Sequence, residues 1–349
     1  MATTQLPKTN KEWILNEYVK GPISDKTFSL KESPVETTVP DGKVLVKVLT
    51  LGLEPAIRPS LSDEPSYRAP HPLGTPVWAY GIGVVAATST PSTHPVGSKV
   101  VGLLSWSQYA LADATALRPY NEQIGLQHLS ALGAPGLAAH IGLFNNVGMK
   151  KGEVVLVSGA AGATGSIVVQ LAKAAGASKI IGVASKSKCQ SVVDNGADVC
   201  LDYGAPSFEE DLIKATERKV DVFFDNVGGL VLDAALVCMA KQGRISVCGA
   251  ISGYQSIGGD KSQVYALKNH TMILRSVLTV KGFIVMPPYT SQEGIGKAVA
   301  ELGKAVVEGK VKTSIYKFPE EGVEHVPAAL HGLLTGQNTG KMTIKIADE

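Results

Sequence analysis

The 349-residue sequence contains only four cysteines, and none of them precedes Cys189. No two cysteines form a Cys-x-x-Cys pair, and the seven histidines show no His-Glu-x-x-His or other clustered metal-ligand spacing. These absences argue against a metal site and against a disulfide framework. We therefore expect four free thiols and no bound metal.

An excess of charge of one sign is also missing, because 33 Lys and Arg residues stand against 31 Asp and Glu residues. Such a balance builds no basic field for nucleic acid or for an anionic membrane. Any anion has to be held by local geometry. The length suffices for two domains, and 44% hydrophobic residues is ordinary for a globular protein.

The chain shows no convincing membrane span or signal peptide. The uncharged run Val154–Ala172 approaches the length of a span, but it is rich in Ala and Gly and polar residues interrupt it. A strand, a turn and a helix inside a soluble α/β core explain it better. Residues Met1–Trp13 lack the apolar core of a signal peptide, so we expect a cytoplasmic protein.

The first 125 residues have the pattern of a β-rich domain. Alternating or continuous apolar runs between Pro, Gly and Ser turns predict strands at Gly42–Leu51, Pro76–Ala87 and Ser98–Leu104. The Pro- and Ser-rich segment Ser60–Leu73 indicates a solvated loop, with a substrate lid as the alternative. We expect a substrate domain over 1–125 that is completed by 312–349.

From about Leu126 onward, helical and strand patterns alternate. A helix at Gln127–Asn145, interrupted at Gly133–Gly136, comes first. The expected strands are Val154–Val157, Lys179–Ala184, Val199–Asp202, Val220–Asn226, Arg244–Cys248 and Thr279–Val285. The expected helices are Thr164–Ala175, one that ends at Val193, Phe208–Glu217, Leu230–Lys241, one near Val264–Leu274, and Gly294–Glu308. This alternation predicts an α/β doubly wound parallel sheet, a Rossmann dinucleotide-binding domain over 126–311.

The last residues again have a β-like pattern. We expect strands at Ser314–Phe318 and Met342–Ile346, with a helix at Val323–Leu334 between them. This tail is expected to return to the first domain.

The strongest chemical signal is the glycine turn in Val157–Ser166, where Gly159, Gly162 and Gly165 are spaced as GxxGxxG. Glycine lets backbone N–H groups approach a pyrophosphate, and the following helix directs its positive end toward that anion. Small residues also serve helix–sheet packing. Because strand, turn, helix and second strand all occur in order, a dinucleotide site is the favoured interpretation.

The end of the second strand indicates the cofactor. An NAD enzyme usually places Asp or Glu there to bind the ribose 2′-hydroxyl. This chain instead has Ser185-Lys186-Ser187-Lys188, whose cations and hydroxyls suit a 2′-phosphate. The alternative is a solvated helix start, although lysine at that position opposes the helix dipole. The sequence therefore favours NADPH.

A β-rich first domain, a GxxGxxG Rossmann core and a C-terminal return together resemble the medium-chain dehydrogenases/reductases, whose first domain is GroES-like. Zinc-dependent members rely on an N-terminal cysteine, a Gly-His-Glu segment and a four-cysteine lobe. This sequence has none of the three, so the resemblance implies a zinc-independent member.

Local strings narrow the resemblance to the prostaglandin/leukotriene reductases and the plant NADPH-dependent alkenal double-bond reductases, over nearly the whole chain. The strings are Asp225–Gly229, Cys248–Tyr254, Val280–Val285 and Asn338–Lys341, of which Cys248–Tyr254 is the most specific. The implied activity is NADPH-dependent reduction of the carbon–carbon double bond of an α,β-unsaturated aldehyde or ketone, by hydride transfer and without metal. The family also implies a homodimer.

The same resemblance assigns the cofactor residues. Gly162, Ala163, Thr164, Gly165 and Ser166 would contact the pyrophosphate. Lys188 and Tyr203 would hold the 2′-phosphate end. The remaining cofactor contacts would come from Asn226, Cys248, Gly249, Ala250, Ile251, Ser252, Gly253, Tyr254, Phe283, Ile284, Val285 and Asn338.

One departure affects the substrate pocket. The family string Asp-Pro-Tyr-Met-Arg is replaced by Glu54-Pro-Ala56-Ile-Arg58, and Ala56 removes a substrate-facing hydroxyl or makes room for a bulkier substrate. Tyr80 still matches a pocket aromatic of the plant enzymes. Arg58 is a candidate contact for a polar substrate tail, with a surface or inter-domain ion pair as the equal alternative.

Reduction of an enal or enone requires a donor aimed at the carbonyl oxygen, where negative charge develops. Tyr254 is the candidate catalytic residue, because its phenol donates without a metal and it follows the fifth strand. Alternatively, Tyr254 packs against the nicotinamide and a ribose hydroxyl polarises the carbonyl.

Other conspicuous residues have structural interpretations. Trp78, Trp106 and Tyr109 are interpreted as packing residues, His140 as facing a helix interface, and Cys248 as a small hydrophobe. Two other functions stay open, namely a quinone reductase of the same fold and a non-catalytic NADPH-binding protein.

Overall fold

The computed structural model describes residues 6–36, 38–89 and 93–349. The chain divides into two compact units. The β-sheet unit comprises Met1–Leu129, Gln255–Asp260 and Ile315–Glu349, and the α/β unit comprises Ser130–Tyr254 and Lys261–Ser314. The short excursion of Gln255–Asp260 into the β-sheet unit is a feature that sequence patterns do not indicate.

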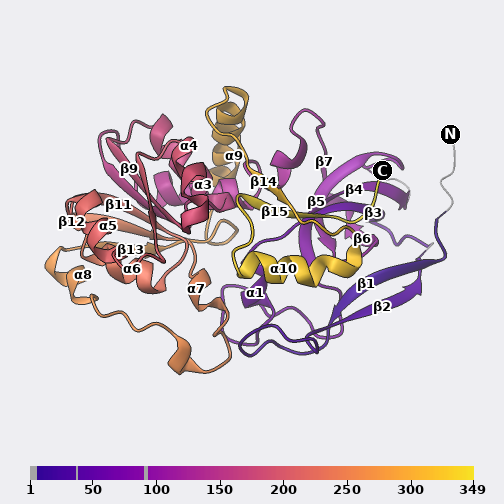
Figure 1. The fold of residues 1–349 in the computed structure, drawn as a ribbon. Coiled ribbons are helices and arrows are strands. Elements are labelled where there is room, and N and C mark those ends of the chain that lie inside the picture. Colours follow the sequence, from indigo (N-terminus) through magenta and orange to yellow (C-terminus); the bar gives the residue numbers. More distant parts are fainter. Residues whose placement is uncertain (1–5, 37, 90–92) are drawn as a thin grey trace. The chain divides into compact units, whose positions relative to one another are not determined.

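The α/β unit is built on a six-stranded parallel sheet with the strand order β10-β9-β8-β11-β12-β13 (Figure 1). Its strands are β8 (Val154–Ser158), β9 (Lys179–Ala184), β10 (Val199–Asp202), β11 (Val220–Asp225), β12 (Met239–Val247) and β13 (Thr279–Gly282). The order reverses between β8 and β11, as in a Rossmann fold. The predicted doubly wound sheet is confirmed.

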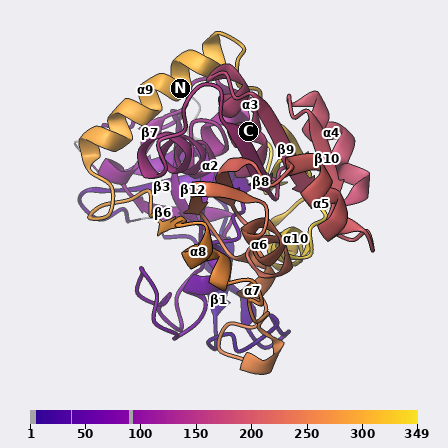
Figure 2. The same cartoon turned by 90° about the vertical axis from the view of Figure 1, so that its left-hand side faces the viewer.

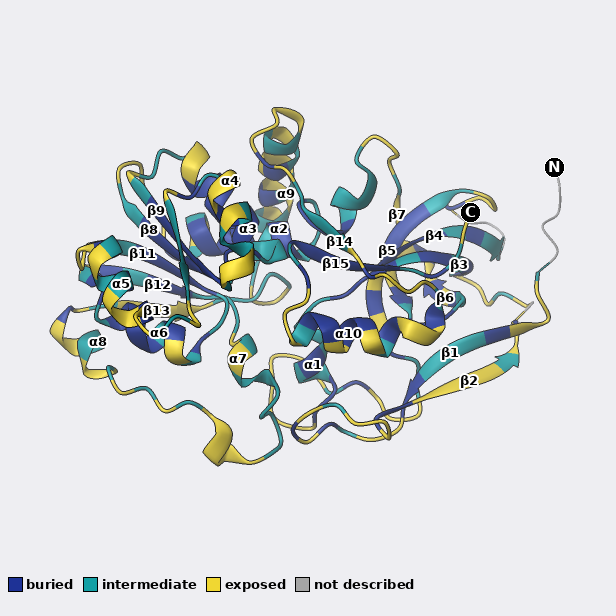
Figure 3. Ribbon diagram, viewed as in Figure 1, coloured by how far each residue is buried: buried dark blue, intermediate teal, exposed yellow. Residues whose placement is uncertain are grey.

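Helices cover both faces of this sheet, because successive strand residues point to opposite sides. Val155 and Val157 of β8 pack in one core with helices α2, α3, α4 and α9. Leu156 packs in a second core with α5 and α6. Figures 2 and 3 show these helices around the sheet, whose strands β8, β9 and β11 are buried along most of their length.

The helices of the α/β unit follow the strands closely. They are α2 (Ala134–His140), the π-helix η3 (Ile141–Asn146), α3 (Ala163–Ala174), η4 (Lys186–Lys188), α4 (Cys189–Asp194), α5 (Phe208–Thr216), α6 (Gly229–Leu236), α7 (Ile251–Tyr254), η5 (Lys261–Gln263), α8 (Thr271–Arg275) and α9 (Gln292–Val307).

Two predicted helices of this unit are wrong in extent. The helix predicted at Leu230–Lys241 ends earlier, since Met239 already pairs with Val220 as the start of β12. The helix near Val264–Leu274 is reduced to α8. The buried Asp233 carboxylate accepts the backbone N–H groups of Lys268 and Asn269, each at 2.8 Å, which holds that segment outside a helix.

The β-sheet unit contains a seven-stranded sheet of order β14-β15-β3-β4-β5-β7, with β6 paired to β3, and a separate hairpin of β1 and β2. Its elements are β1 (Thr9–Leu15), β2 (Phe28–Pro34), β3 (Lys43–Gly52), α1 (Ile57–Ser60), β4 (Trp78–Thr88), β5 (Lys99–Ser105), β6 (Tyr109–Asp113), η1 (Ala114–Ala116), β7 (Arg118–Pro119), η2 (Gly125–Leu129), β14 (Ile315–Lys317), η6 (Val323–His325), α10 (Val326–Leu334) and β15 (Lys341–Lys345).

The C-terminal tail is part of the β-sheet unit, in which β15 pairs antiparallel with β3. The β1–β2 hairpin went unpredicted. Its second strand is charged and mostly exposed, so its sequence does not show the alternation of apolar and polar residues that indicates a strand.

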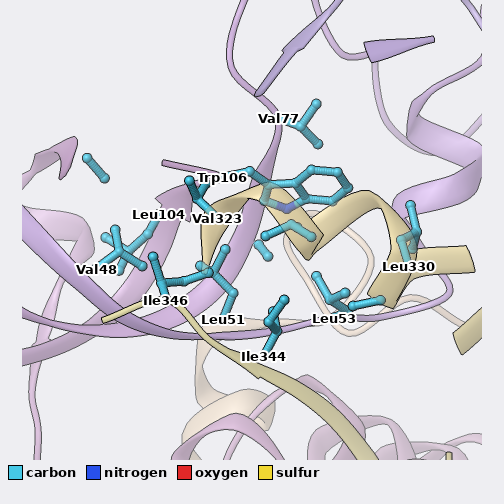
Figure 4. Packing of buried hydrophobic residues seen from close by; sticks show 14 of the residues in the cluster. Val48, Leu51, Leu53, Val77, Leu104, Trp106, Val323, Leu330, Ile344 and Ile346 are labelled. Carbon is cyan, nitrogen blue, oxygen red and sulfur yellow. The ribbon is translucent and has the colours of Figure 1, made fainter. Parts of the chain in front are cut away.

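The core of the β-sheet unit surrounds Trp106, whose side chain is completely buried (Figure 4). Val48, Leu51 and Leu104 from the sheet pack in the same cluster as Leu330 of α10. Helix α10 contributes buried residues at helical spacing, which explains its amphipathic pattern. The interpretation of Trp106 as a packing residue is confirmed.

A buried ion pair holds the start of β15 in this unit. Lys341 is 1% exposed, and its Nζ lies 3.0 Å from Oε1 of Glu54, in the segment that follows β3. Burial lowers the pKa of Lys341, and the Glu54 carboxylate opposes that shift. The pair therefore fixes the Asn338–Lys341 string against the chain around Glu54.

No helix in the described part of the chain is both long enough and apolar enough to cross a membrane.

Candidate functional site

The turn between β8 and α3 is tightly packed against the start of the helix. Gly159 has a φ of +57°, a conformation that favours glycine. A Cβ on Gly165 would lie 2.3 Å from the carbonyl oxygen of Gly159 and 2.8 Å from Cα of Ala160. Only glycine fits at position 165, so the start of α3 lies directly against the turn.

The first turn of α3 presents unpaired backbone donors. Gly162 is the N-cap without any side-chain cap, and the first turn holds no acidic residue. The N–H groups of Ala163, Thr164 and Gly165 have no partner inside an α-helix at those positions. With the positive end of the helix dipole, they form a cradle suited to a phosphate.

The ends of β9 and β10 bring Lys188 and Tyr203 to the same edge of the sheet. The backbone N–H of Tyr203 donates to the carbonyl of Ala184 at 3.3 Å, and that of Lys188 donates to Ser185 at 2.9 Å. Tyr203 is 49% exposed. Burial lowers the pKa of Lys188, whose side chain is only partly hydrated.

A polar network that sequence reasoning missed joins the ends of β8 and β11. The Ser158 hydroxyl donates to Oδ1 of Asp225 at 2.7 Å and accepts from the backbone N–H of Asn226 at 2.8 Å. Nδ2 of Asn226 donates to the Ser158 carbonyl at 2.7 Å. Two polar residues ending adjacent parallel strands are the signal that could have indicated the network.

Asp225 anchors the loop that follows β11. Its Oδ1 also accepts the N–H groups of Val227 and Gly228, each at 3.0 Å. Burial raises the pKa of Asp225, and the donors of these hydrogen bonds partly offset that shift. Asp225 is completely buried, so its role is to shape the loop that carries Asn226.

The Cys248–Tyr254 segment is fixed to that same loop. The backbone N–H groups of Cys248 and Gly249 donate to the Asp225 carbonyl, and the Ser252 hydroxyl donates to the Val227 carbonyl at 2.6 Å. Burial raises the pKa of the Cys248 thiol to about 12, which keeps it protonated. The segment therefore contributes backbone and hydroxyl groups to the edge of the sheet.

Tyr254 closes the segment at the end of α7. A Cβ built on Gly249 would lie 3.4 Å from the Tyr254 hydroxyl and 3.2 Å from the Asn226 carbonyl oxygen. The phenol therefore folds back over Gly249, at the carboxyl end of β12. Ligands bind at this edge in doubly wound sheets.

Phe283 to Val285 follow β13 and are half-buried. The Phe283 ring lies 6.2 Å from the Phe224 ring, centroid to centroid, in an edge-on arrangement. A Cβ on Gly142 of η3 would lie 2.4 Å from Phe283, so this glycine makes room for the aromatic ring.

The structure thus brings the predicted residues from Gly162 to Val285 to one edge of the sheet in the α/β unit. The remaining three candidates belong to the β-sheet unit. Nδ2 of the buried Asn338 donates to the Gly340 carbonyl at 2.6 Å.

Arg58 is completely buried, so the alternative of a surface ion pair is wrong. Its Nη2 donates to the carbonyls of Gly21 and Ile257, the second at 3.0 Å. Burial lowers its pKa to about 10. Arg58 therefore holds the Gln255–Asp260 segment, which directly follows Tyr254, within the β-sheet unit.

Tyr80 lies on β4 and is 41% exposed. Trp78 is 45% exposed and stands on the same face of that strand, so its interpretation as a core residue is wrong. The Trp78 ring meets His71 edge-on, with the ring centroids 4.3 Å apart. Leu103, which pairs with Tyr80 across the sheet, is also exposed.

His140 lies between helices, as expected. It is 6% exposed, and its Nε2 lies 2.6 Å from Oε2 of Glu301 on α9. Across residues 6–36, 38–89 and 93–349, no group of three or more His, Cys, Asp or Glu side chains could hold a metal ion.

Two family models match the chain. Residues 163–301 match a model described as zinc-binding dehydrogenase, and residues 11–120 match the N-terminal domain of an oxidoreductase. The NADPH-dependent curcumin reductase of Escherichia coli is 32% identical, over 99% of this chain and 99% of its own length. The chain belongs to the medium-chain dehydrogenase/reductase family. The resemblance seen in the sequence is confirmed.

Two further members of this medium-chain family are similar over almost their whole length. The NADP⁺-dependent 2-alkenal reductase of Nicotiana tabacum is 32% identical, over 98% of each chain. The structure of CurA from Vibrio vulnificus in complex with NADPH superposes with a TM-score of 0.86. It is 29% identical, and the match covers 97% of this chain and 100% of CurA.

Because of the close approach at Gly165, substitution by alanine should lower stability at Gly165 and raise it at Gly303, a glycine in α9. Gly165→Ala forces the turn apart and lowers the free energy of unfolding by about 1–3 kcal/mol. Gly303→Ala in α9 is the matched control, since a Cβ there meets nothing within 4 Å. It should raise stability by about 0.5–1 kcal/mol. Thermal melting of both variants checks the contrast, and equal melting temperatures would contradict the steric argument.

Proposed function

We propose that this protein uses NADPH to reduce the carbon–carbon double bond of α,β-unsaturated aldehydes or ketones. The observation that carries the proposal is the glycine turn that leads into α3, with its uncapped first turn. The relatives add support, because one is named an NADPH-dependent reductase and another a 2-alkenal reductase.

The residues of this turn fit the pyrophosphate of NADPH. The space beside Gly165 is closed to any Cβ, and the absence of an acidic residue in the first turn of α3 leaves the positive helix end uncompensated. Ala163, Thr164, Gly165 and Ser166 would bind the pyrophosphate through backbone and hydroxyl groups. When bound, NADPH supplies the hydride.

Lys188 and Tyr203 would recognise the 2′-phosphate. Both lie where β9 and β10 end, and no carboxylate follows β9 to bind a free 2′-hydroxyl. The partial burial of Lys188 strengthens its attraction to a phosphate, because less water screens the charge.

Lys188→Ala should therefore weaken NADPH binding on the order of tenfold or more, which is the loss of one charge-assisted contact. The dissociation constant for NADH should change little, because NADH lacks the 2′-phosphate. Titration by the quenching of protein fluorescence measures both constants. Lys173→Ala, on the last turn of α3, is the control. An equal loss for NADPH and NADH would contradict the assignment of Lys188.

Tyr254 is proposed as the donor that polarises the substrate carbonyl. Its hydroxyl lies over Gly249 at the ligand-binding edge of the sheet, and a phenol donates a hydrogen bond at neutral pH. This donor stabilises the negative charge that develops on the carbonyl oxygen as the β-carbon accepts hydride.

Tyr254→Phe should lower kcat for enals and enones by about 10²–10³, the usual cost of one oxyanion donor, and should leave the NADPH dissociation constant nearly unchanged. NADPH oxidation is followed by absorbance against a panel of enals, enones and quinones. Turnover of quinones alone would favour a quinone reductase, and binding without any turnover would favour a non-catalytic protein. Unchanged kcat in the variant would exclude Tyr254 as the donor.

The exposed face of β4 is proposed as a wall for the apolar part of the substrate. Tyr80 and Trp78 present aromatic surface on this face, and Leu103 of β5 lies opposite Tyr80. Aromatic rings suit a conjugated, flat substrate. Arg58 is excluded from direct contact with substrate in this proposal, because its guanidinium is buried among backbone carbonyls.

The proposal includes a homodimer formed through β13. This strand lies at one edge of the parallel sheet, and its residues are exposed. Val280 on the strand is 43% exposed, and Val277, just before the strand, is 66% exposed. An exposed edge strand that carries a valine is a template for a second copy of the same strand. A cytoplasmic location is also proposed, since four free thiols suit a reducing compartment; cell fractionation tests it.

Val280→Asp should convert the dimer to the 36.5 kDa monomer, because it places charge in the paired edge. Light scattering after size-exclusion chromatography measures the mass. Val307→Asp at the end of α9 is the control, since Val307 is 88% exposed outside the sheet. A monomeric wild-type protein, or a dimer that persists in Val280→Asp, would contradict this interface.

A further inference from the structure

Two cysteines that have no part in the reaction lie in contact beside the 2′-phosphate residues. The Sγ atoms of Cys189 and Cys200 are 2.6 Å apart, although the residues are separated by 11 positions. Both thiols are free and partly accessible. Cys238, by contrast, is completely buried. The contact therefore joins two partly buried cysteines from different elements of the fold.

The pair bridges the two segments that carry Lys188 and Tyr203. Cys189 directly follows Lys188 and opens α4. Cys200 belongs to β10, which pairs with β9 at Gly182 and leads into Tyr203. A covalent bond between these sulfurs would link the start of α4 to β10, next to the proposed phosphate contacts.

We propose that Cys189 and Cys200 form a reversible disulfide in the presence of hydroperoxides, and that this bond weakens the binding of NADPH. The effect on NADPH rests on the proposed function. The formation of the disulfide does not, because it depends only on the two thiols.

The chemistry balances with a hydroperoxide as oxidant. Burial and the neighbouring Cys189 sulfur raise the pKa of Cys200, so Cys200 is the poorer nucleophile and Cys189 is assigned the first step. The Cys189 sulfur attacks the peroxide oxygen and loses its proton, giving Cys189 sulfenic acid and releasing an alcohol, or water from hydrogen peroxide. The Cys200 sulfur then displaces hydroxide from the sulfenic acid, and water leaves as the disulfide forms. Two thiols are oxidised by two electrons and the peroxide bond is reduced.

Formation of the bond requires adjustment at Cys189, which directly follows Lys188. The sulfurs must approach from 2.6 Å to about 2.05 Å, with a dihedral angle near 90° about the new bond. The Cys189 backbone belongs to the turn that holds Lys188, where the Lys188 N–H donates to Ser185 and its carbonyl accepts the Ser191 hydroxyl. Closing the disulfide therefore strains the turn that positions Lys188. By linkage, bound NADPH favours the dithiol by the same factor.

The test treats purified protein with hydrogen peroxide and compares it with protein kept in dithiothreitol. Peptide mass spectrometry should show a Cys189–Cys200 cross-link with the loss of two hydrogens, and dithiothreitol should reverse it. NADPH affinity should fall on the order of tenfold in the oxidised form, within the usual range of coupling between two sites. NADH affinity should stay within twofold of its value in the reduced form, on the order of the error of such titrations.

Three variants make the experiment specific. Cys200→Ser and Cys189→Ser should each abolish the cross-link and keep NADPH affinity insensitive to peroxide. Cys238→Ala removes a thiol of the same unit outside the pair and should respond as the wild type does.

Absence of the cross-link in wild-type protein would overturn the proposal. A cross-link that leaves NADPH affinity unchanged would also overturn it, and so would one that lowers the affinities for NADPH and NADH equally. If the reduced protein binds no NADPH, the proposed function fails and the regulatory effect fails with it. The cross-link in the mass spectrum would then stand as a separate result.

Discussion

The close contact between the start of α3 and the turn that follows β8 is the constraint on which the rest of this structure depends. Gly165 lies so near the Gly159 carbonyl that no side chain can stand between them. This packing fixes where the helix begins, and it leaves the first-turn N–H groups of α3 pointing out of the sheet edge. A helix held one residue further along would present its donors elsewhere. The anion site is therefore a consequence of steric packing.

The neighbouring strand ends are tied to that turn by buried hydrogen bonds. Ser158 at the end of β8 binds Asp225 and Asn226 at the end of β11, and the Asp225 carbonyl in turn accepts from the residues that follow β12. Tyr254 is thus connected to the glycine turn through three adjacent strands. Buried polar networks of this kind rigidify a site, because each unpaired group would cost free energy.

Much of the fold could be predicted because its signals are local. The strands Lys179–Ala184 and Val199–Asp202 have the predicted bounds, since short β-branched runs between helices allow few alternatives. The glycine turn was predicted for the same reason, as its spacing alone restricts the backbone. The Ser185–Lys188 segment was found from its position after the second strand, and family resemblance added Tyr203, which no local pattern connects to it.

What escaped prediction depends on contacts between distant residues. Asp233 removes a helix by binding backbone groups far along the chain, and Asp225 shapes the loops of three strands. The sequence made Arg58 a candidate substrate contact or ion-pair partner, yet its partners are backbone carbonyls brought together only by the fold. The contact between Cys189 and Cys200 belongs to the same class, because their spacing matches no redox motif.

Hydrogen exchange of the backbone N–H groups of Ala163, Thr164 and Gly165 tests the central claim most directly. The wild-type protein is compared alone, with NADPH and with NADH at equal concentration. Saturating NADPH should slow exchange at these amides more than at any other part of the α/β unit, and NADH should do so only at higher concentration. Protection that appears elsewhere while these three amides exchange unchanged would contradict the account.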